Sequence, residues 1–166
     1  MTLLITQTLI RPAKPEEAAL LTELTLRSKA HWGYDAEFMA DVRAEMVVTL
    51  EQIRDGWVHV LESASQICGY YDLEKCDDEI VWLESLFIEP EAMGQGVGSQ
   101  LWNHAVETAR SSGYRFMEFE SDPNAEGFYL KKGAVRVSAR PRPINGQPDR
   151  LLPKMRYALY TKEEIS

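Results

Sequence analysis

The segment from Ile80 to Gly98 constrains the fold of this 166-residue chain more than any other part of the sequence. It reads IVWLESLFIEPEAMGQGVG: an apolar stretch with strand character, a proline turn, and a loop with glycine at positions 94, 96 and 98. Apolar residues at helical spacing follow at once, and we expect them to form one face of a helix: Leu101, Trp102, Ala105, Val106 and Ala109. The fold must therefore place a glycine loop between a buried strand and the start of a helix.

This glycine loop has the chemistry of a phosphate receptor. The first N–H groups of a helix have no intrahelical acceptor, and the helix dipole adds partial positive charge there. Such a loop can hold a phosphate or pyrophosphate. A P-loop would need Lys after Gly98, and a dinucleotide fingerprint would need glycine where Ser99 stands. The alternative interpretation is a glycine-rich turn without a ligand.

Strand, loop and helix in this order resemble the coenzyme A site of the GNAT superfamily of acyl-CoA N-acyltransferases. The family pattern [Gln/Arg]-x-x-Gly-x-[Gly/Ala] places Gly96 and Gly98 correctly, although Met93 stands at its first position. The resemblance implies that acetyl-CoA binds this loop through seven residues: Met93, Gly94, Gln95, Gly96, Val97, Gly98 and Ser99. It also implies that the strand splays from a parallel neighbour, so that the main chain of Leu86, Phe87 and Ile88 pairs with pantetheine.

The remaining pattern fits the same family. We expect strands near residues 3–10, 57–62, 67–74, 80–88, 114–120, 135–138 and 154–160. We expect helices near 15–30, 35–55, 98–112 and 125–132, with Pro15 opening the first and Asp35 capping the second. The order resembles that of GNAT proteins. It implies one domain over residues 1–166, an α/β (α+β) fold with a single central mixed, mostly antiparallel twisted sheet flanked by about four helices.

Acyl transfer to an amine requires a base for the amine, stabilisation of the oxyanion and a proton for the departing thiolate. Glu84 is the candidate base, because a carboxylate among apolar residues on a central strand should have a raised pKa. Some GNAT enzymes place the base on this strand, whereas others use a different residue or a water chain. A structural Glu84, paired with a basic residue, is the alternative.

Tyr129 is the candidate acid. The stretch from Asp122 onward resembles the family segment Asn-x-x-Ala-x-x-x-Tyr-x-x-x-Gly-Phe, in which the tyrosine can protonate the coenzyme A sulfur. The family Asn falls on Asp122, with Asn124 nearby, so either side chain could contact pantetheine. Ala134 replaces the usual Phe. The alternative role for Tyr129 is that of a core tyrosine.

His31, Trp32 and Tyr34 lie between the first two expected helices, a connection that lines the acceptor pocket in GNAT folds. They could bind an aromatic or cationic group, or they could cap the core between the helices. The other candidate side chains are expected to be structural or solvated: His59, His104, Cys68, Arg136, Arg140, Arg142 and Arg150.

The net charge of −8 argues against nonspecific binding to nucleic acid or to an anionic membrane. It is compatible with a cationic amine substrate. Cys68 and Cys76 have no metal-ligand spacing, so we expect free thiols and no metal site. The first ten residues lack a basic n-region, and no apolar run approaches membrane-spanning length, so we expect a cytoplasmic protein.

The resemblance implies transfer of an acetyl group from acetyl-CoA to a primary amine, by direct attack in a ternary complex. The acceptor would be a small-molecule or peptide amine, and a homodimer is compatible with the sequence. Two alternatives stay open. One is a non-catalytic, acyl-CoA-binding regulatory module. The other is an acyltransferase with another acyl donor or a hydroxyl acceptor.

Overall fold

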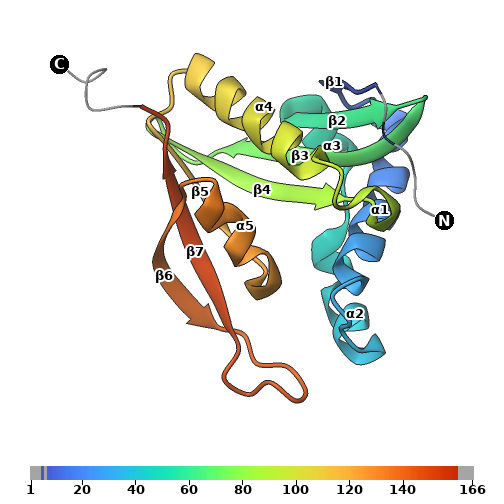
Figure 1. Cartoon of the computed structure of the whole chain (residues 1–166), viewed down its shortest axis with the longest axis vertical. Helices are drawn as coiled ribbons and strands as arrows, with labels where there is room; N and C mark the ends of the chain where they lie inside the picture. Colours follow the sequence, from blue (N-terminus) through green and yellow to red (C-terminus); the bar gives the residue numbers. More distant parts are fainter. Residues whose placement is uncertain (1–4, 6, 161–166) are drawn as a thin grey trace. The chain divides into compact units, whose positions relative to one another are not determined.

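A computed structural model describes residues 5 and 7–160 (Figure 1). The described residues form two compact units, the first from residues 5, 7–73 and 85–105 and the second from residues 74–84 and 106–160. Seven strands are hydrogen-bonded in the order β1-β2-β3-β4-β5-β7-β6. The parallel pair is β4–β5, and the pairs β1–β2, β2–β3, β5–β7 and β6–β7 are antiparallel. The predicted mixed, mostly antiparallel α/β fold is confirmed, whereas the single domain over 1–166 stays a prediction.

The first unit contains an antiparallel meander and three helices. The strands are β1 (Leu9–Pro12), β2 (Trp57–Ser63) and β3 (Gln66–Lys75). The helices are α1 (Ala18–Ala30), α2 (Ala36–Val42) and α3 (Leu50–Asp55), with short 3-10 turns η1 (Pro15–Glu17) and η2 (Arg43–Met46). Leucines of α1 pack on apolar residues of α3, β2 and β3 to form one core cluster: Leu21, Leu24, Val48, Ile53, Val58, Val60 and Tyr70.

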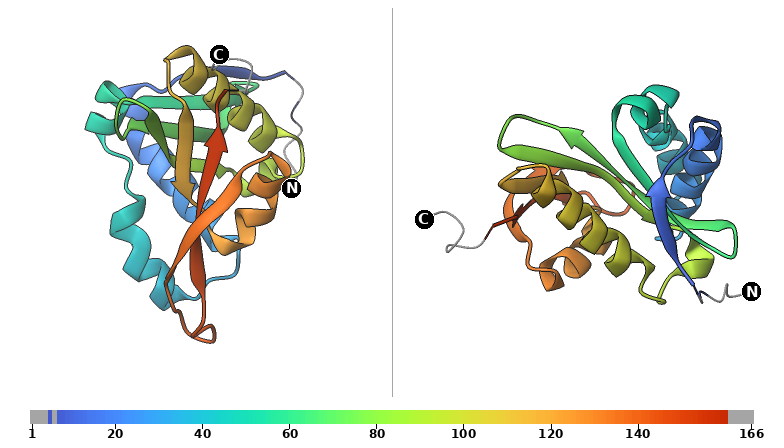
Figure 2. Two further views of the ribbon diagram at one scale, coloured as in Figure 1. Left: turned by 90° about the vertical axis from the view of Figure 1, so that its left-hand side faces the viewer. Right: turned by 90° about the horizontal axis from the view of Figure 1, so that it is seen from above.

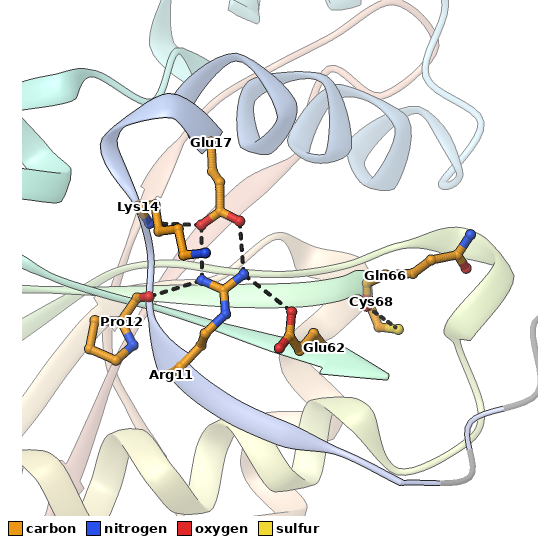
Figure 3. Close-up of polar contacts among 7 residues, drawn as sticks. All are labelled: Arg11, Pro12, Lys14, Glu17, Glu62, Gln66 and Cys68. Carbon is orange, nitrogen blue, oxygen red and sulfur yellow. Dashed lines mark hydrogen bonds and ion pairs between the residues drawn. The ribbon is translucent and has the colours of Figure 1, made fainter. Parts of the chain in front are cut away.

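The N-terminal end of this unit is held by Arg11 (Figure 3). Its guanidinium donates to both carboxylate oxygens of Glu17, at 3.0 and 2.8 Å, and to Glu62 at 3.2 Å. Glu17 also accepts from the backbone N–H of Lys14, at 2.7 Å. The Arg11 charge lowers the pKa of Glu17, so the ion pair persists at neutral pH. Arg11 therefore joins β1, the turn that opens α1, and β2.

Two predictions for the first unit were wrong in extent. The predicted strand at 3–10 is β1 (Leu9–Pro12), and residues 1–4 and 6 lie outside the described residues. Pro12 fits because β1 is the first strand of the sheet order, where a missing N–H costs no ladder bond. The predicted helix at 35–55 is interrupted, because Thr49 accepts from the N–H of Gln52 at 3.1 Å and starts α3 anew. Asp35 caps α2 as predicted, accepting from the N–H of Phe38 at 2.8 Å.

The second unit holds the start of β4 (Ile80–Ile88) together with β5 (Phe116–Glu120), β6 (Val135–Pro141) and β7 (Leu151–Ala158). A 3-10 turn, η4 (Pro123–Ala125), leads into α5 (Glu126–Lys131). Figure 2 shows β6 and β7 as a long hairpin. Both strands are longer than predicted, since Pro153 lies in β7 and pairs with Ala139, which reduces the predicted loop from residue 140 to 153 to residues 142–150.

The helix that follows the glycine loop is α4 (Val97–Ser111), which begins in the first unit and ends in the second. Its predicted apolar face is confirmed, because all five of its residues are buried: Leu101, Trp102, Ala105, Val106 and Ala109. Among residues 5 and 7–160, no helix has the length and apolar character needed to cross a membrane.

Candidate active site

The loop between β4 and α4 has the backbone of an anion receptor. A 3-10 turn, η3 (Pro90–Ala92), ends β4, and the N–H of Met93 donates to the carbonyl of Pro90 at 3.3 Å. Gly94 and Gly96 then adopt φ of +80° and +81°, a region that glycine occupies without steric cost. The N–H of Gln100 donates to the carbonyl of Gly96 at 3.0 Å, so hydrogen bonding of the helix begins there.

Several donors of this loop are left for a ligand. Within the described part of the chain, the backbone N–H groups of Gly94, Gly96, Gly98 and Ser99 donate no hydrogen bond. A Cβ placed on Gly94 or Gly96 would meet no atom within 4 Å, so no neighbouring atom crowds the side-chain position of either residue. N–H groups that have no acceptor among residues 5 and 7–160, at the N-terminus of a fifteen-residue helix, favour an anion. The loop therefore has backbone donors that a pyrophosphate could use, and the predicted binding of coenzyme A here stays a prediction.

Side chains of the loop are used mainly to hold it. Val97 is buried, and Met93 is half-buried. The side-chain oxygen of Gln95 accepts from the backbone N–H of Ile5, at 2.9 Å. Gln100, one turn later, accepts from the hydroxyl of Thr8 at 2.7 Å. A contact from the Gln95 side chain to coenzyme A stays a prediction.

The end of β4 that precedes the loop is fixed on two sides. Arg27 of α1 donates to both carboxylate oxygens of Glu89, at 2.7 and 2.9 Å, while the N–H of Glu89 donates to the carbonyl of Cys68 at 2.8 Å. A Cβ on Gly69 would come within 2.9 Å of the carbonyl oxygen of Phe87, so only glycine permits this approach. Sequence reasoning missed both the Arg27–Glu89 pair and the close approach of Gly69 to Phe87. The available signal for the close approach was a glycine inside a strand pattern.

The parallel ladder between β4 and β5 is short. It runs from Ile80 paired with Phe116 to Trp82 paired with Glu118. In the second unit, β4 continues to Glu84 and β5 to Glu120 without a further described pair. The described pairing of the two strands thus stops two residues before the candidate base, and the predicted splay beyond it stays a prediction. The contact of Leu86, Phe87 and Ile88 with pantetheine stays a prediction.

The pKa of Glu84 is raised, although the residue is exposed. Its side chain is exposed, whereas the adjacent Leu83 is buried on the other face of β4. Partial desolvation by the surrounding protein raises the pKa of Glu84, and the like charges of Glu74 and Glu120 raise it further. The indole N–H of Trp82 donates to Glu84 at 2.8 Å and opposes this shift. The predicted direction of the pKa shift is confirmed, whereas the catalytic role stays a prediction.

Tyr129 lies on α5 with 7% of its surface exposed. Its ring packs against Phe119 of β5 and against Phe128, with centroid distances of 4.5 and 5.1 Å. Burial raises the pKa of the phenol well above its ordinary value, and the charge of Asp122 adds to this. Tyr129 therefore keeps its proton at neutral pH and can act as a donor.

The two candidates for the pantetheine contact interact with each other. One carboxylate oxygen of Asp122 accepts from both the backbone N–H and the side-chain amide of Asn124, each at 2.9 Å. The other lies 3.8 Å from Arg150 Nη2. Arg150 is buried, so the expectation of a solvated side chain was wrong for it. Arg136 and Arg140 lie in β6 and not in a loop, and each forms an ion pair with a glutamate.

The three aromatic residues after α1 are not equivalent. His31 and Trp32 are exposed, with ring centroids 6.0 Å apart. Tyr34 packs on Phe38 at 4.3 Å, and Lys29 Nζ lies 5.2 Å from the centroid of the Tyr34 ring. The protein thus places a cation of its own on Tyr34. An acceptor-binding role for the three residues stays a prediction.

His59 and His104 form a structural cluster with Tyr71. The hydroxyl of Tyr71 hydrogen-bonds His104 Nδ1 at 2.7 Å, and His59 stacks on the Tyr71 ring at 5.1 Å. Burial lowers the pKa of both histidines.

Comparison with known proteins shows similarity to one family. Residues 54–133, which include the glycine loop and Tyr129, match the family model of the acetyltransferase (GNAT) domain. This segment of the protein resembles a GNAT acetyltransferase domain. The chain is 28% identical over 125 residues, 75% of its own length and 84% of the relative's, to the 5-NmdU N-acetyltransferase of Pseudomonas phage PaMx11.

Solved GNAT structures share the fold. The PaiA N-acetyltransferase from Thermoplasma acidophilum, in complex with coenzyme A, superposes with a TM-score of 0.72 at 17% identity, covering 92% of this chain and 99% of that one. YncA from Salmonella typhimurium, with acetyl-CoA, gives 0.69 at 21% identity, covering 94% and 96%. These two likenesses show that the chain shares its fold with proteins that were solved with coenzyme A or acetyl-CoA.

Proposed function

We propose that the enzyme acetylates a primary amine by direct attack in a ternary complex. The observation that carries the proposal is the glycine loop at the start of α4, where the N–H groups of Gly94, Gly96, Gly98 and Ser99 are left without acceptors in the described chain. These groups would hold the pyrophosphate. The main chain of residues 86–88 would hold pantetheine. Acetyl-CoA supplies the acetyl group as a thioester.

In this proposal Glu84 accepts the proton that the acceptor's ammonium must lose before its nitrogen attacks. An ordinary carboxylate is a weak base for this step. The raised pKa of Glu84, caused by desolvation and by Glu74 and Glu120, narrows the gap to the amine. The Trp82 hydrogen bond of 2.8 Å orients the carboxylate. Proton removal takes place directly or through a water molecule.

Tyr129 acts as donor to the sulfur when the new N–C bond has formed and the C–S bond breaks. A free thiol has a pKa of about 8.5, and the pKa of Tyr129 is raised above the ordinary phenol value of about 10. Full proton transfer from the phenol is therefore uphill. We propose that Tyr129 contributes mainly a hydrogen bond that stabilises the departing thiolate, with the proton supplied as the product leaves.

The acceptor is proposed to be a small-molecule or peptide amine that contacts His31, Trp32 and Tyr34. Exposure of His31 and Trp32 supports this placement. The phage relative is named for 5-NmdU, which makes 5-NmdU the first acceptor to try. A single domain over residues 1–166, a cytoplasmic location and a homodimer remain part of the proposal.

The test begins with thermal melting of the full chain with and without acetyl-CoA. A panel of primary amines, with 5-NmdU and matched alcohols, is then assayed for free-thiol release, and the products are weighed by mass spectrometry. We expect stabilisation by acetyl-CoA and a product heavier by one acetyl group on nitrogen. Stabilisation without turnover of any acceptor would favour the regulatory module. Acetylation of the alcohols alone, or faster turnover of a longer acyl-CoA, would favour the other alternative.

A further inference from the structure

Arg150 is an unusually enclosed charge for a residue beside a hairpin loop. It lies at the point where loop 142–150 meets β7, and only 2% of its side chain is exposed. Enclosing a guanidinium is costly unless its N–H groups meet acceptors and its charge meets an opposite charge. The groups around Arg150 therefore indicate what the residue holds in place.

The contacts of Arg150 close the β6–β7 loop. Its Nη1 donates to the carbonyl of Arg142 at 3.2 Å, and the N–H of Arg142 donates back to the carbonyl of Arg150 at 2.9 Å. The N–H of Arg150 donates to the carbonyl of Gln147 at 3.3 Å. Both ends of the loop and its far turn are thus joined through this residue.

The same guanidinium reaches the segment that carries Tyr129. Arg150 Nη2 lies 3.8 Å from Asp122, whose other carboxylate oxygen accepts from the backbone N–H of Asn124 at 2.9 Å. The carbonyl of Asp122 accepts from the N–H of Ala125 at 2.9 Å, which closes η4. Since η4 leads without interruption into α5, the placement of Asp122 sets the start of the helix that presents Tyr129.

We propose that Arg150 is a positioning residue for acetyl transfer: it pins the β6–β7 loop to Asp122 and thereby fixes the turn that presents Tyr129. The inference rests on the proposed role of Tyr129 as the donor to sulfur. The carboxylate of Asp122 is at the same time held beside a counter-charge, so that it does not stand alone near the phenol. Arg150 acts through Asp122 and touches no reacting atom.

The test uses the full chain with Arg150→Met, Arg150→Lys and the double variant Asp122→Asn/Arg150→Met. Arg150→Met should lower kcat by roughly 10- to 100-fold, the scale of a displaced catalytic group, with KM for acetyl-CoA within about twofold of wild type. Lysine keeps the charge but not the planar fork, so Arg150→Lys should be intermediate. The double variant leaves no unpaired carboxylate and should recover part of the loss.

A measurement independent of turnover accompanies these rates. Hydrogen exchange of residues 142–150 should quicken in Arg150→Met and return toward wild type in Arg150→Lys, while the melting temperature reports whether each variant is folded. If hydrogen exchange of residues 142–150 is unchanged in a folded Arg150→Met protein, Arg150 does not hold the loop in place. A loss of kcat that only follows the folded fraction would overturn the positioning role.

A further pair of variants separates this inference from the function on which it rests. In a Tyr129→Phe background, Arg150→Met should reduce kcat by less than about twofold, because the group it positions is already removed. An equal fractional loss in both backgrounds would refute the inference and leave the role of Tyr129 intact. Full activity of Tyr129→Phe alone would instead refute the proposed donor, whatever Arg150→Met does.

Discussion

Replacing Gly96 with alanine should weaken acetyl-CoA binding without any steric clash. A Cβ at Gly96 would meet no atom within 4 Å, but the residue has φ of +81°. An L-residue in this region is strained by about 1–2 kcal/mol. If the free loop relaxes and must return to this shape on binding, the strain is added to the free energy of binding. The expected rise in Kd is then about 5- to 30-fold, since about 1.4 kcal/mol corresponds to a factor of ten.

Gly96→Asp adds a negative charge to the same strain. Two unit charges about 4 Å apart repel by about 1 kcal/mol in water and about 4 kcal/mol at an effective dielectric constant of about 20. Together with the strain, this gives roughly 2–6 kcal/mol, or a Kd raised by about 30-fold to more than 10⁴-fold. The aspartate variant should therefore bind clearly worse than the alanine variant.

Titration calorimetry with acetyl-CoA measures both effects. Gly113→Ala is the matched control, because Gly113 has φ of +91°, no atom within 4 Å of a built Cβ, and a place after α4 where no phosphate is expected. Its Kd should equal that of wild type, and its melting temperature reports whether the variant is folded. Wild-type affinity in Gly96→Asp, or equal Kd values for the alanine and aspartate variants, would refute the assignment of the loop.

Three further predictions concern the proposed catalytic groups. Glu84→Gln should lower kcat near neutral pH by roughly 10²–10⁴-fold and abolish the acidic limb of the pH–rate profile. Glu74→Gln should move that limb to lower pH, because it removes one of the charges that raise the pKa of Glu84. If both variants have the pH–rate profile of wild type, Glu84 is not the base. Tyr129→Phe should reduce kcat at every pH with unchanged acetyl-CoA affinity. The pKa of Tyr129 is raised above that of an ordinary phenol, so the pH–rate profile of wild type should show no basic limb below the ordinary phenol pKa. A basic limb below that pKa, present in wild type and absent in Tyr129→Phe, would contradict this. The pKa of Glu84 is higher in the folded protein than in the unfolded chain, so wild type loses stability as pH rises from the unfolded pKa through the folded pKa. Glu84→Gln should therefore melt at a higher temperature than wild type at pH 7, but not at pH near 4. The reverse order of melting temperatures would contradict the direction of the shift.

Features that depend on residues close together in the sequence could be predicted. The glycine loop and the apolar face of α4 could be read because glycine spacing and helical periodicity lie within about twenty residues. The break between α2 and α3 was readable from Thr49 and Gln52, a capping box that sequence reasoning passed over. The β6–β7 hairpin was underestimated because Pro153 indicates a loop, whereas pairing of β7 with β5 and β6 overrides that tendency.

Other features depend on residues far apart in the chain. Arg27 meets Glu89 across 62 positions, and nothing in either neighbourhood indicates the pair. Enclosure of Arg150 by the β6–β7 loop likewise follows from tertiary packing. The raised pKa of Glu84 was predicted from apolar neighbours, but two other glutamates contribute to it. Their approach to Glu84 requires the folded sheet.

The hydrogen bond between Trp82 and Glu84 gives the proposed base an optical probe of its own. Indole emission responds to a charge on its N–H partner, so protonation of Glu84 should change the emission of Trp82, whose donor nitrogen lies 2.8 Å from the carboxylate. The chain has four tryptophans, and the difference between wild type and Trp82→Phe isolates the signal of interest. Fluorescence followed across pH would thus measure the ionisation of Glu84 in the resting enzyme, before any acceptor is known.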